Sequence, residues 1–308
     1  MKPKRLRRCQ LSVPGSSDKM LAKAATIEVD YIFLDLEDAV APNRKAEART
    51  NVIEAIRHTR FRAPTIAVRI NDLSSPWAYD DLTALVEGCG AALDVIVVPK
   101  VMGPRDVEFV DRLLGMLEAR HQIGRRIGIE VLIEEVEAIA SVEAIAGASA
   151  RLEGLIFGMG DYAASQGMRV SGVGETDDYP GDLFHYHRNR VAIAARINGL
   201  VAVDGPYADF RNPAKYRKEA RRAALLGFAG KWAIHPSQIE LAETIFSPDP
   251  ATVVRARAMA DAYAAARERG EGAINFEGNM IDIASVRGVR ELVELADMIE
   301  ARQASVAR

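Results

Sequence analysis

The 308-residue sequence contains few cysteines and no long apolar run, and both absences narrow the class of protein. Cys9 and Cys89 cannot build a disulfide framework, which is typical of a reducing compartment, and we expect a cytoplasmic protein. No apolar run reaches the roughly 18 residues that a membrane-spanning helix needs, so no membrane partner is expected. The basic cluster at 2–8 leads into Pro14 and Gly15 rather than into the apolar segment of a secretory signal.

An excess of positive charge is also missing. The formal net charge is −3, so we expect no nucleic-acid partner. No Gly-x-Gly-x-x-Gly follows an apolar run, which disfavours a doubly wound dinucleotide-binding sheet, and no Gly-x-Ser-x-Gly supports a serine hydrolase. The basic cluster at 2–8 is interpreted as a solvated tail, with contact between Arg8 or a neighbouring residue and an anionic ligand as the alternative.

The sequence does show a regular alternation of short apolar runs and Ala-rich segments. Eight runs have the apolar character of strands that are covered on both faces, namely Gln10–Val13, Tyr31–Leu36, Thr65–Ile70, Val95–Pro99, Ile127–Ile133, Leu155–Gly158, Leu200–Asp204 and Gly230–Ile234. Helical spacing lies between them, at Arg44–Arg57, Tyr79–Glu87, Arg105–Arg120, Val136–Ala146, Tyr186–Asn198 and Lys215–Leu226. This alternation predicts an α/β protein, a (β/α)₈ TIM-type barrel, rather than an open sheet.

The pattern changes after residue 246. We predict a barrel domain over 1–246 and a C-terminal helical extension over 247–308, with helices near Ala251–Arg269 and Ser285–Arg302. The extension is expected to cap the barrel or an oligomer interface. The loop Gly167–Pro180 is rich in glycine and acidic residues, and its role as a lid or as a simple connection stays open.

Active sites of such barrels lie where the strands end, and two neighbouring strands of this chain end in charged residues. The second predicted strand ends in Asp35, Glu37 and Asp38, which are costly to bury unless they are paired or bound to a metal. The third ends in Arg69, whose guanidinium suits a carboxylate or a developing oxyanion. Ion pairs between Arg69 and these acids are the structural alternative, and the two roles are compatible.

More carboxylates follow the fifth and sixth predicted strands. Either Glu134 or Glu135 can converge with Asp161, because adjacent strand ends meet at the same edge of a barrel. Two oxygen ligands with room for water and substrate indicate Mg²⁺, although spacing alone leaves the choice of glutamate open. Lys100 follows the fourth strand, where a Schiff-base role ranks below an electrostatic or structural one, and His235 is interpreted as structural.

These residues lie in segments that resemble the citrate lyase β-subunit-like (HpcH/HpaI aldolase) family, and within it the malyl-CoA branch. The matching segments run in order along nearly the whole chain: Val13-Pro14-Gly15-Ser16, Phe33–Pro42, Val68–Asn71, Val98–Val101, Leu132–Glu134, Gly160–Ser165, Val203–Pro206 with Asp209 and Phe210, Gly230–Gln238 and Ile281–Ser285.

The resemblance implies a Mg²⁺-dependent C–C lyase, with Mn²⁺ as the alternative metal. It implies reversible cleavage of (S)-malyl-CoA to glyoxylate and acetyl-CoA, through an enolate that the metal and Arg69 stabilise. β-Methylmalyl-CoA, which would give propionyl-CoA, is a second candidate substrate. A CoA thioester and a 2-oxo acid are thus the expected small-molecule partners.

The resemblance also implies roles for single residues. Glu134 and Asp161 would bind the metal, Arg69 would contact the reacting oxygens, and Glu37 and Asp38 would hold Arg69 and metal-bound water.

Three more residues match residues of the family that bind CoA or act in catalysis. Ser16 and Lys23 match residues that bind CoA. Asp282 matches an acid/base group that a neighbouring subunit supplies, so a homo-oligomer, a trimer or a hexamer, is expected.

Other functions on the same site stay open. A malyl-CoA thioesterase, malate synthase-like chemistry and citryl-CoA cleavage would use the same residues. The stretch Gly167–Arg188 is shorter than its counterpart in the family, which leaves the exact acyl substrate open. A non-catalytic binding barrel is a different class, and it predicts that Arg69, Glu134 and Asp161 do not converge.

Overall fold

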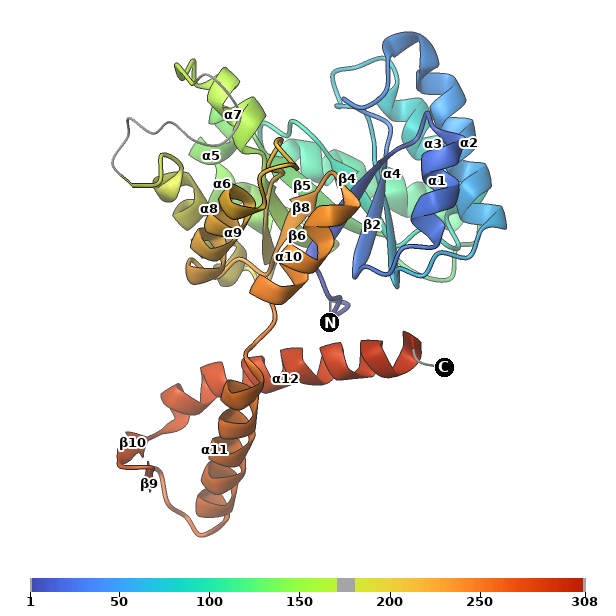
Figure 1. Ribbon diagram of the computed structural model, residues 1–308. Coiled ribbons are helices and arrows are strands. Elements are labelled where there is room, and N and C mark those ends of the chain that lie inside the picture. The colour runs from blue at the N-terminus through green and yellow to red at the C-terminus, as the bar shows by residue number, and fades with distance from the viewer. Residues whose placement is uncertain (1, 171–180, 307–308) are drawn as a thin grey trace. The chain divides into compact units, whose positions relative to one another are not determined.

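The computed structural model describes residues 2–170 and 181–306, and these residues form two units, Met1–Glu243 and Thr244–Arg308. In the first unit, eight parallel strands close into a barrel in chain order, and helices surround them (Figure 1). The predicted TIM-type barrel is therefore confirmed. The strands are β1 (Cys9–Pro14), β2 (Tyr31–Asp35), β3 (Thr65–Arg69), β4 (Val95–Val98), β5 (Gly128–Ile133), β6 (Leu152–Phe157), β7 (Val201–Asp204) and β8 (Gly230–Ala233).

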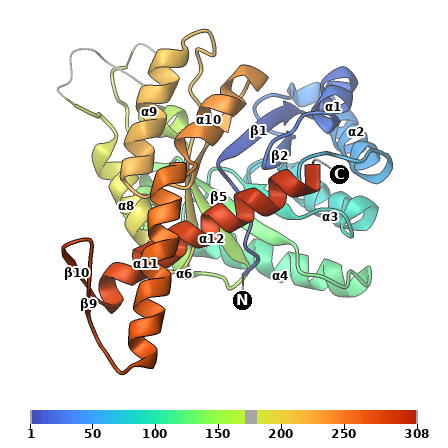
Figure 2. The ribbon, with the colours of Figure 1, turned by 60° about the horizontal axis from the view of Figure 1, so that its bottom comes forward.

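The helices of the barrel unit follow the strands around the outside (Figure 2). They are α1 (Asp18–Ala25), α2 (Lys45–His58), α3 (Ala78–Cys89), α4 (Pro104–Arg120), α5 (Val136–Ala140), α6 (Val142–Gly147), α7 (Met159–Ser165), α8 (His185–Ile197) and α9 (Pro213–Leu225), with 3₁₀ turns at Pro42–Arg44 and Pro236–Gln238. The boundary between the two units falls within α10 (Ile239–Ile245).

Two local features explain where helices of the barrel begin and break. α9 begins where the Asn212 side chain accepts the Lys215 N–H and Pro213 fills the first position. The single helix predicted over 136–146 is wrong, because the structure breaks it into α5 and α6 at Ser141. The Ser141 hydroxyl donates to the Glu137 carbonyl and competes with the regular backbone pattern there.

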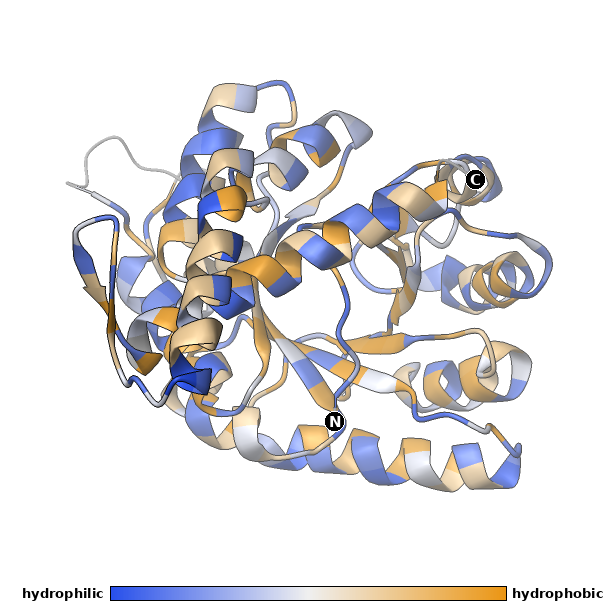
Figure 3. Cartoon of the chain, turned by 90° about the horizontal axis from the view of Figure 1, so that it is seen from below, coloured by the Kyte–Doolittle hydropathy of each residue, from blue (hydrophilic) through white to orange (hydrophobic). Residues whose placement is uncertain are grey.

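The barrel interior has a polar layer at each end and an apolar layer between them. Period-2 alternation along β5 puts Glu130, Leu132 and Glu134 on the same inward face. The middle layer includes Phe33, Leu132, Ile156, Val203 and Trp232, all of them buried. Seen from below, the barrel strands are mainly apolar, whereas the surrounding helices mix apolar and polar residues (Figure 3). The two polar layers leave charged side chains at both ends of the barrel.

The N-terminal segment is part of the barrel. Arg7 and Arg8 are buried, so the interpretation of a solvated tail is wrong for these residues. Arg8 donates to both carboxylate oxygens of Asp30 at 2.7 Å, and Arg7 donates to Glu130 at 2.6 Å and to Glu153 at 2.5 Å. The alternative contact of Arg8 with an anionic ligand is replaced by this internal ion pair.

The second unit contains two helices joined by a β-hairpin. Its elements are α11 (Pro250–Glu268), β9 (Ile274–Phe276), β10 (Asn279–Ile281) and α12 (Ile283–Val306). Glu277 and Gly278 both have positive φ angles, as the tight turn of a two-residue hairpin requires. Tyr263, Ile281 and Val286 form the small core of the unit. A contribution of this unit to an oligomer interface stays a prediction.

Residues 171–180, which make up most of the predicted loop Gly167–Pro180, lie outside the described residues. Within the described part of the chain, no helix is long and apolar enough to cross a membrane.

The barrel closes between β8 and β1, and at this junction Gly230 has no room for a side chain. A Cβ atom at this position of β8 would overlap the main-chain carbonyl of Arg7, which cannot move without breaking the pairing of β1 with β8. We expect Gly230→Ala to destabilise the barrel by about 3 kcal/mol, measured by thermal unfolding. Gly124→Ala is the control, because a Cβ there meets nothing within 4 Å. Equal melting temperatures for the two variants would contradict this prediction.

Candidate active site at the mouth of the barrel

Arg69 is the fixed centre of the site. It ends β3 directly beside Asp35, which ends β2 in the same register. Its Nε and Nη2 each donate to one carboxylate oxygen of Asp35 at 2.7 Å, and this bidentate geometry fixes the plane of the guanidinium. Burial lowers the pKa of Arg69, but Asp35, Glu37 and Asp38 outweigh burial and raise that pKa above its usual value. Arg69 is therefore a permanent cation.

Asp35 also organises the loop that follows β2. Its oxygens accept the backbone N–H groups of Glu37 and Ala39 at 2.9 and 3.3 Å. This local turn brings the Glu37 carboxylate within 2.7 Å of Arg69 Nη1, and Asp38 within 3.5 Å of the same nitrogen. The ion pairs that the sequence left as the structural alternative are thus present, and they are centred on Asp35.

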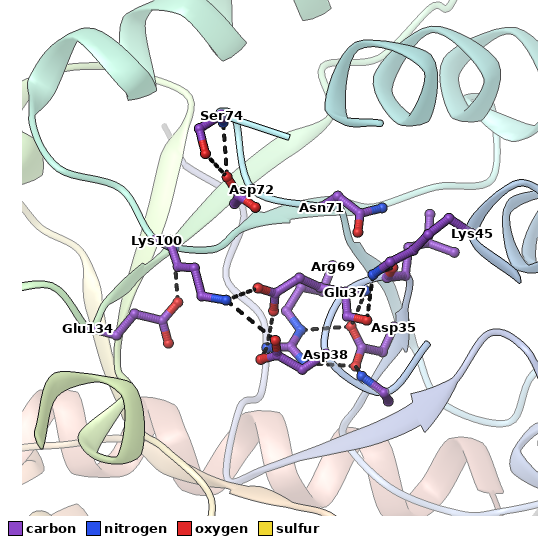
Figure 4. A network of polar contacts seen from close by, with 12 residues as sticks. Asp35, Glu37, Asp38, Lys45, Arg69, Asn71, Asp72, Ser74, Lys100 and Glu134 are labelled. Atoms are coloured by element: carbon purple, nitrogen blue, oxygen red, sulfur yellow. Dashed lines mark hydrogen bonds and ion pairs between the residues drawn. The ribbon is translucent and has the colours of Figure 1, made fainter. Parts of the chain in front are cut away.

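Lys100 joins this acidic loop to Glu134 (Figure 4). Its Nζ lies 2.6 Å from Glu37 and 3.4 Å from Asp38, and its backbone N–H donates to Glu134 Oε1 at 2.8 Å. Lys100 adopts a positive φ of 49°, an uncommon backbone conformation outside glycine that turns both groups toward their partners.

The charges around Lys100 argue against a Schiff base. Burial lowers the pKa of Lys100, but the hydrogen bond and charge of Glu37 outweigh burial and raise that pKa above its usual value. A protonated amine is not a nucleophile, so this arrangement favours the electrostatic role. Burial in turn raises the pKa of Glu37 to about 7, against the lowering effects of Arg69 and Lys100.

Glu134 and Asp161 both line the mouth. Glu134 follows β5 and is 1% exposed, while Asp161 is exposed in the first turn of α7. Burial and the nearby charge of Asp161 raise the pKa of Glu134 well above its usual value. A Cβ atom at Gly158 would overlap the Glu134 carboxylate, so the lack of a side chain at Gly158 leaves the space that this carboxylate occupies. Glu135 instead occupies the N-cap position of α5.

The mouth holds a cavity of about 390 Å³ that is lined by both charged and apolar residues. Arg69, Glu134 and Asp161 converge there, as expected of a site and not of a non-catalytic barrel. The charged lining comes from Asp38, Arg69, Glu134 and Asp161, and the rest is Ser12, Leu132, Ile156, Gly158, Gly160, Gly205, Pro206, Ala208, Trp232 and Ile234.

The donor set fits a hard divalent cation with an open coordination sphere. Among the described residues, no group of three or more His, Cys, Asp or Glu side chains could hold a metal. A closed structural zinc site is therefore not built by this part of the chain. Two carboxylates on one cavity leave positions for water and substrate, as Mg²⁺ commonly requires. A cation there would also offset the repulsion that raises the pKa of Glu134.

Four predicted residues are not among those that line the cavity. One is Glu37, which contacts Arg69 and Lys100, and the others are Ser16, Lys23 and Asp282. Ser16 lies in the turn between β1 and α1, and Lys23 is exposed in the last turn of α1. Asp282 belongs to the second unit, where its Oδ1 accepts the Ser285 N–H and hydroxyl at the start of α12. Their proposed roles in CoA binding and proton transfer stay predictions.

The sequence placed Asp35 and Lys100 at strand ends but did not predict their contacts with Arg69, Glu37 and Glu134. The register of β2 with β3, which puts Asp35 beside Arg69, was the available signal for Asp35. No sequence pattern predicts the positive φ angle that gives Lys100 its two contacts.

An eight-stranded parallel barrel with a fixed arginine and two carboxylates at its mouth is suited to metal-assisted cleavage or formation of a carbon–carbon bond. The family model of the HpcH/HpaI aldolase/citrate lyase family matches residues 8–236, and the chain belongs to this family. This confirms the family resemblance and the expectation that the chain is an enzyme, a carbon–carbon lyase.

Individual proteins are similar over almost the whole chain. The L-malyl-CoA/beta-methylmalyl-CoA lyase of Cereibacter sphaeroides is 41% identical over 97% of this chain and 97% of its own. The CitE protein of Mycobacterium tuberculosis, solved with magnesium, acetoacetate and coenzyme A, is 27% identical, with a TM-score of 0.71 over 94% of this chain and 97% of that one. A citrate lyase from Burkholderia xenovorans, at 22% identity, shares the fold, with a TM-score of 0.82 over 95% of this chain and 92% of that one.

The carboxylate pair predicts stabilisation by Mg²⁺. At a concentration about 100-fold above its dissociation constant, a cation that binds only the folded state adds about 2.7 kcal/mol of stability. We expect Mg²⁺ to raise the melting temperature of the wild type and of Glu135→Gln, and to leave that of Glu134→Gln almost unchanged. Loss of the Mg²⁺ effect in Glu135→Gln instead would show that Glu135, and not Glu134, binds the metal.

Proposed function

We propose that this lyase reversibly cleaves (S)-malyl-CoA to glyoxylate and acetyl-CoA, with β-methylmalyl-CoA, which gives propionyl-CoA, as a second substrate. The observation that carries the proposal is the convergence of Arg69, Glu134 and Asp161 on one cavity. The similarity to the Cereibacter sphaeroides lyase over 97% of both chains supports this choice of thioester.

In this proposal Glu134 and Asp161 hold Mg²⁺, with Mn²⁺ as the alternative. When bound, the metal supplies a Lewis acid that polarises the carbonyl of the 2-oxo acid and orients it. Magnesium in the related Mycobacterium tuberculosis protein supports this choice of ion. Lys100 assists through its backbone N–H, which holds one oxygen of Glu134 and leaves the other side of the carboxylate to face the mouth.

Arg69 would stabilise the charge that moves between the two substrate oxygens. In the condensation direction, the thioester methyl group loses a proton and becomes an enolate, whose carbon attacks the aldehyde carbon of glyoxylate. Negative charge then passes from the thioester oxygen to the new alkoxide oxygen, which would take a proton from solvent to become the hydroxyl group of malyl-CoA. A guanidinium that three carboxylates already hold in place needs little reorganisation to follow this charge.

Asp282 would take the methyl proton and return it in the cleavage direction. Since Asp282 lies in the C-terminal unit, the family resemblance implies that a neighbouring subunit supplies it, and the active protein is then a homo-oligomer, a trimer or a hexamer. Ser16 and Lys23 would contact the CoA part of the thioester. A cytoplasmic location, predicted from cysteine use, stays a prediction.

A malyl-CoA thioesterase and a citryl-CoA lyase are the alternatives on the same site. Hydrolysis needs water at the acyl carbon, and cleavage of citryl-CoA needs room for a larger acid. The decisive assay incubates purified protein with malyl-CoA and follows glyoxylate, acetyl-CoA, malate and free CoA together, with and without EDTA. We expect glyoxylate and acetyl-CoA in equal amounts, and none with EDTA. Malate and free CoA without glyoxylate would establish the thioesterase and overturn the lyase.

The proposed metal ligand gives a matched pair of variants for this assay. Glu134→Gln keeps the size of the side chain but removes its charge, and we expect kcat to fall by at least about 100-fold. Glu135→Gln makes the same change one residue along the chain and should keep wild-type kcat. Comparable losses in both variants would argue against a specific role for Glu134.

If a neighbouring subunit supplies Asp282, two inactive variants should complement each other in a mixed oligomer. Asp282→Asn and Glu134→Gln should each be inactive alone. After joint unfolding and refolding, random assembly should restore about a quarter of the sites, because one kind of site then combines two intact residues. Measured glyoxylate release should therefore return in the mixture only. No recovery, with normal oligomer size, would place Asp282 in the site of its own chain.

A further inference from the structure

Trp232 lies directly beneath the guanidinium of Arg69. It belongs to β8, is 3% exposed and contributes to the cavity wall. The Arg69 Cζ atom lies 5.5 Å from the centre of the indole ring, and Phe33 packs against the ring with centroids 4.2 Å apart. The indole is thus the apolar support on which the charged end of Arg69 rests. None of the roles assigned above to Arg69 accounts for how this support is held in place.

A buried chain of hydrogen bonds holds the indole from below. The Trp232 Nε1–H donates to Gln10 Oε1 at 2.6 Å, Gln10 Nε2 donates to Glu130 Oε2 at 2.9 Å, and Arg7 Nε donates to Glu130 Oε1 at 2.6 Å. We call these four residues the Trp232 relay. They come from the N-terminal segment, β1, β5 and β8, and none is more than 3% exposed.

The relay has only one self-consistent direction. Glu130 Oε1 accepts from the Arg7 guanidinium, and Glu130 Oε2 accepts from the NH₂ group of the Gln10 amide. The amide oxygen then faces Trp232, whose indole N–H can only donate. An arginine at the lower end of the barrel therefore fixes the orientation of the indole below the mouth.

We propose that Gln10 is a positioning residue for the lyase reaction, acting through Trp232 on Arg69. The proposal rests on the function proposed above, because Arg69 must contact the reacting oxygens for its position to matter. An indole that loses its hydrogen bond can tilt in its plane between Phe33 and Arg69. Arg69 then loses its support on one side while keeping its ion pairs with Asp35, and its alignment with the developing charge is degraded.

The test uses Gln10→Met, which preserves length and removes both hydrogen-bonding groups. Because misplacement of a group that acts on the transition state lowers turnover, we expect kcat to fall by about 10-fold to 100-fold. The KM for malyl-CoA should change by less than about 2-fold, because the position of Arg69 matters most once charge has developed on the reacting oxygens. An unchanged kcat in a folded Gln10→Met would overturn the proposal.

Tyr216→Phe is the matched control. It also deletes one buried hydrogen bond to Trp232, but this bond runs from the Tyr216 hydroxyl to the main-chain carbonyl of Trp232 at 3.2 Å. A loss of stability comparable to that of Gln10→Met is expected, with kcat unchanged. Equal losses of kcat in both variants would reduce the relay to a purely structural role.

A spectroscopic measurement tests the relay without any turnover. The sequence contains two tryptophans, so Trp77→Phe leaves Trp232 as the single emitter. Adding Gln10→Met should move the emission to shorter wavelength, because an indole without a hydrogen-bond acceptor has a less stabilised excited state. Adding Tyr216→Phe should not move it. An unshifted spectrum would show that Gln10 does not hold the indole.

A double-mutant cycle keeps the proposal testable if Gln10→Met proves unstable. Trp232→Phe keeps a ring beneath Arg69 but has no N–H, so Gln10→Met should cost no further kcat in that background. Additive losses would overturn the relay. If the wild type releases no glyoxylate from malyl-CoA, the proposed function fails while the fluorescence shift still reports on the relay, and the two failures are therefore distinguishable.

Discussion

The bidentate ion pair between Asp35 and Arg69 is the contact on which the mouth of the barrel depends. It joins the ends of two neighbouring strands, and the same aspartate turns the following loop by accepting two backbone N–H groups. Glu37 and Asp38 reach Arg69 only because that loop is fixed, and Lys100 reaches Glu37 for the same reason. A buried arginine with fewer partners would be costly, whereas a fully paired one is a rigid cation.

The charge balance of the mouth explains why a cation suits it. Asp35, Glu37 and Asp38 are offset by Arg69 and Lys100, while Glu134 and Asp161 add two more carboxylates and have no equivalent set of basic partners in the described contacts. Burial and mutual repulsion then raise the pKa of Glu134. In the proposed lyase, a divalent ion would neutralise this excess and leave Arg69 to follow the charge of the reacting oxygens. The paired guanidinium of Arg69 and the less fully paired carboxylates of Glu134 and Asp161 therefore complement each other. The first would stabilise negative charge on the substrate, and the second would bind the cation.

The sequence predicted the barrel because each strand and helix carries its own local pattern. It also predicted Arg69, Glu37 and Asp38 at strand ends, since parallel strands bring their carboxyl ends together. It failed at the N-terminus, where basic residues usually indicate solvent, because the acids that bury Arg7 lie 123 and 146 residues away. The helix break at Ser141 and the positive φ of Lys100 depend on single local conformations that composition does not encode. The roles of Ser16, Lys23 and Asp282 rest on the family resemblance, since none of these three residues lines the cavity.

The period-2 pattern of β5 shows how one strand serves stability and chemistry at once. Glu130, Leu132 and Glu134 share its inward face, so the polar lower layer, the apolar middle layer and the mouth are rigidly spaced along one backbone. A movement of Glu130 cannot be isolated from the mouth, because Gln10 and Trp232 connect the same carboxylate to the underside of Arg69. Polar groups in a barrel core are costly unless every one is paired. A completely paired chain of them has one geometry only, and this uniqueness is what a site needs when it must hold a guanidinium within a fraction of an ångström of moving charge.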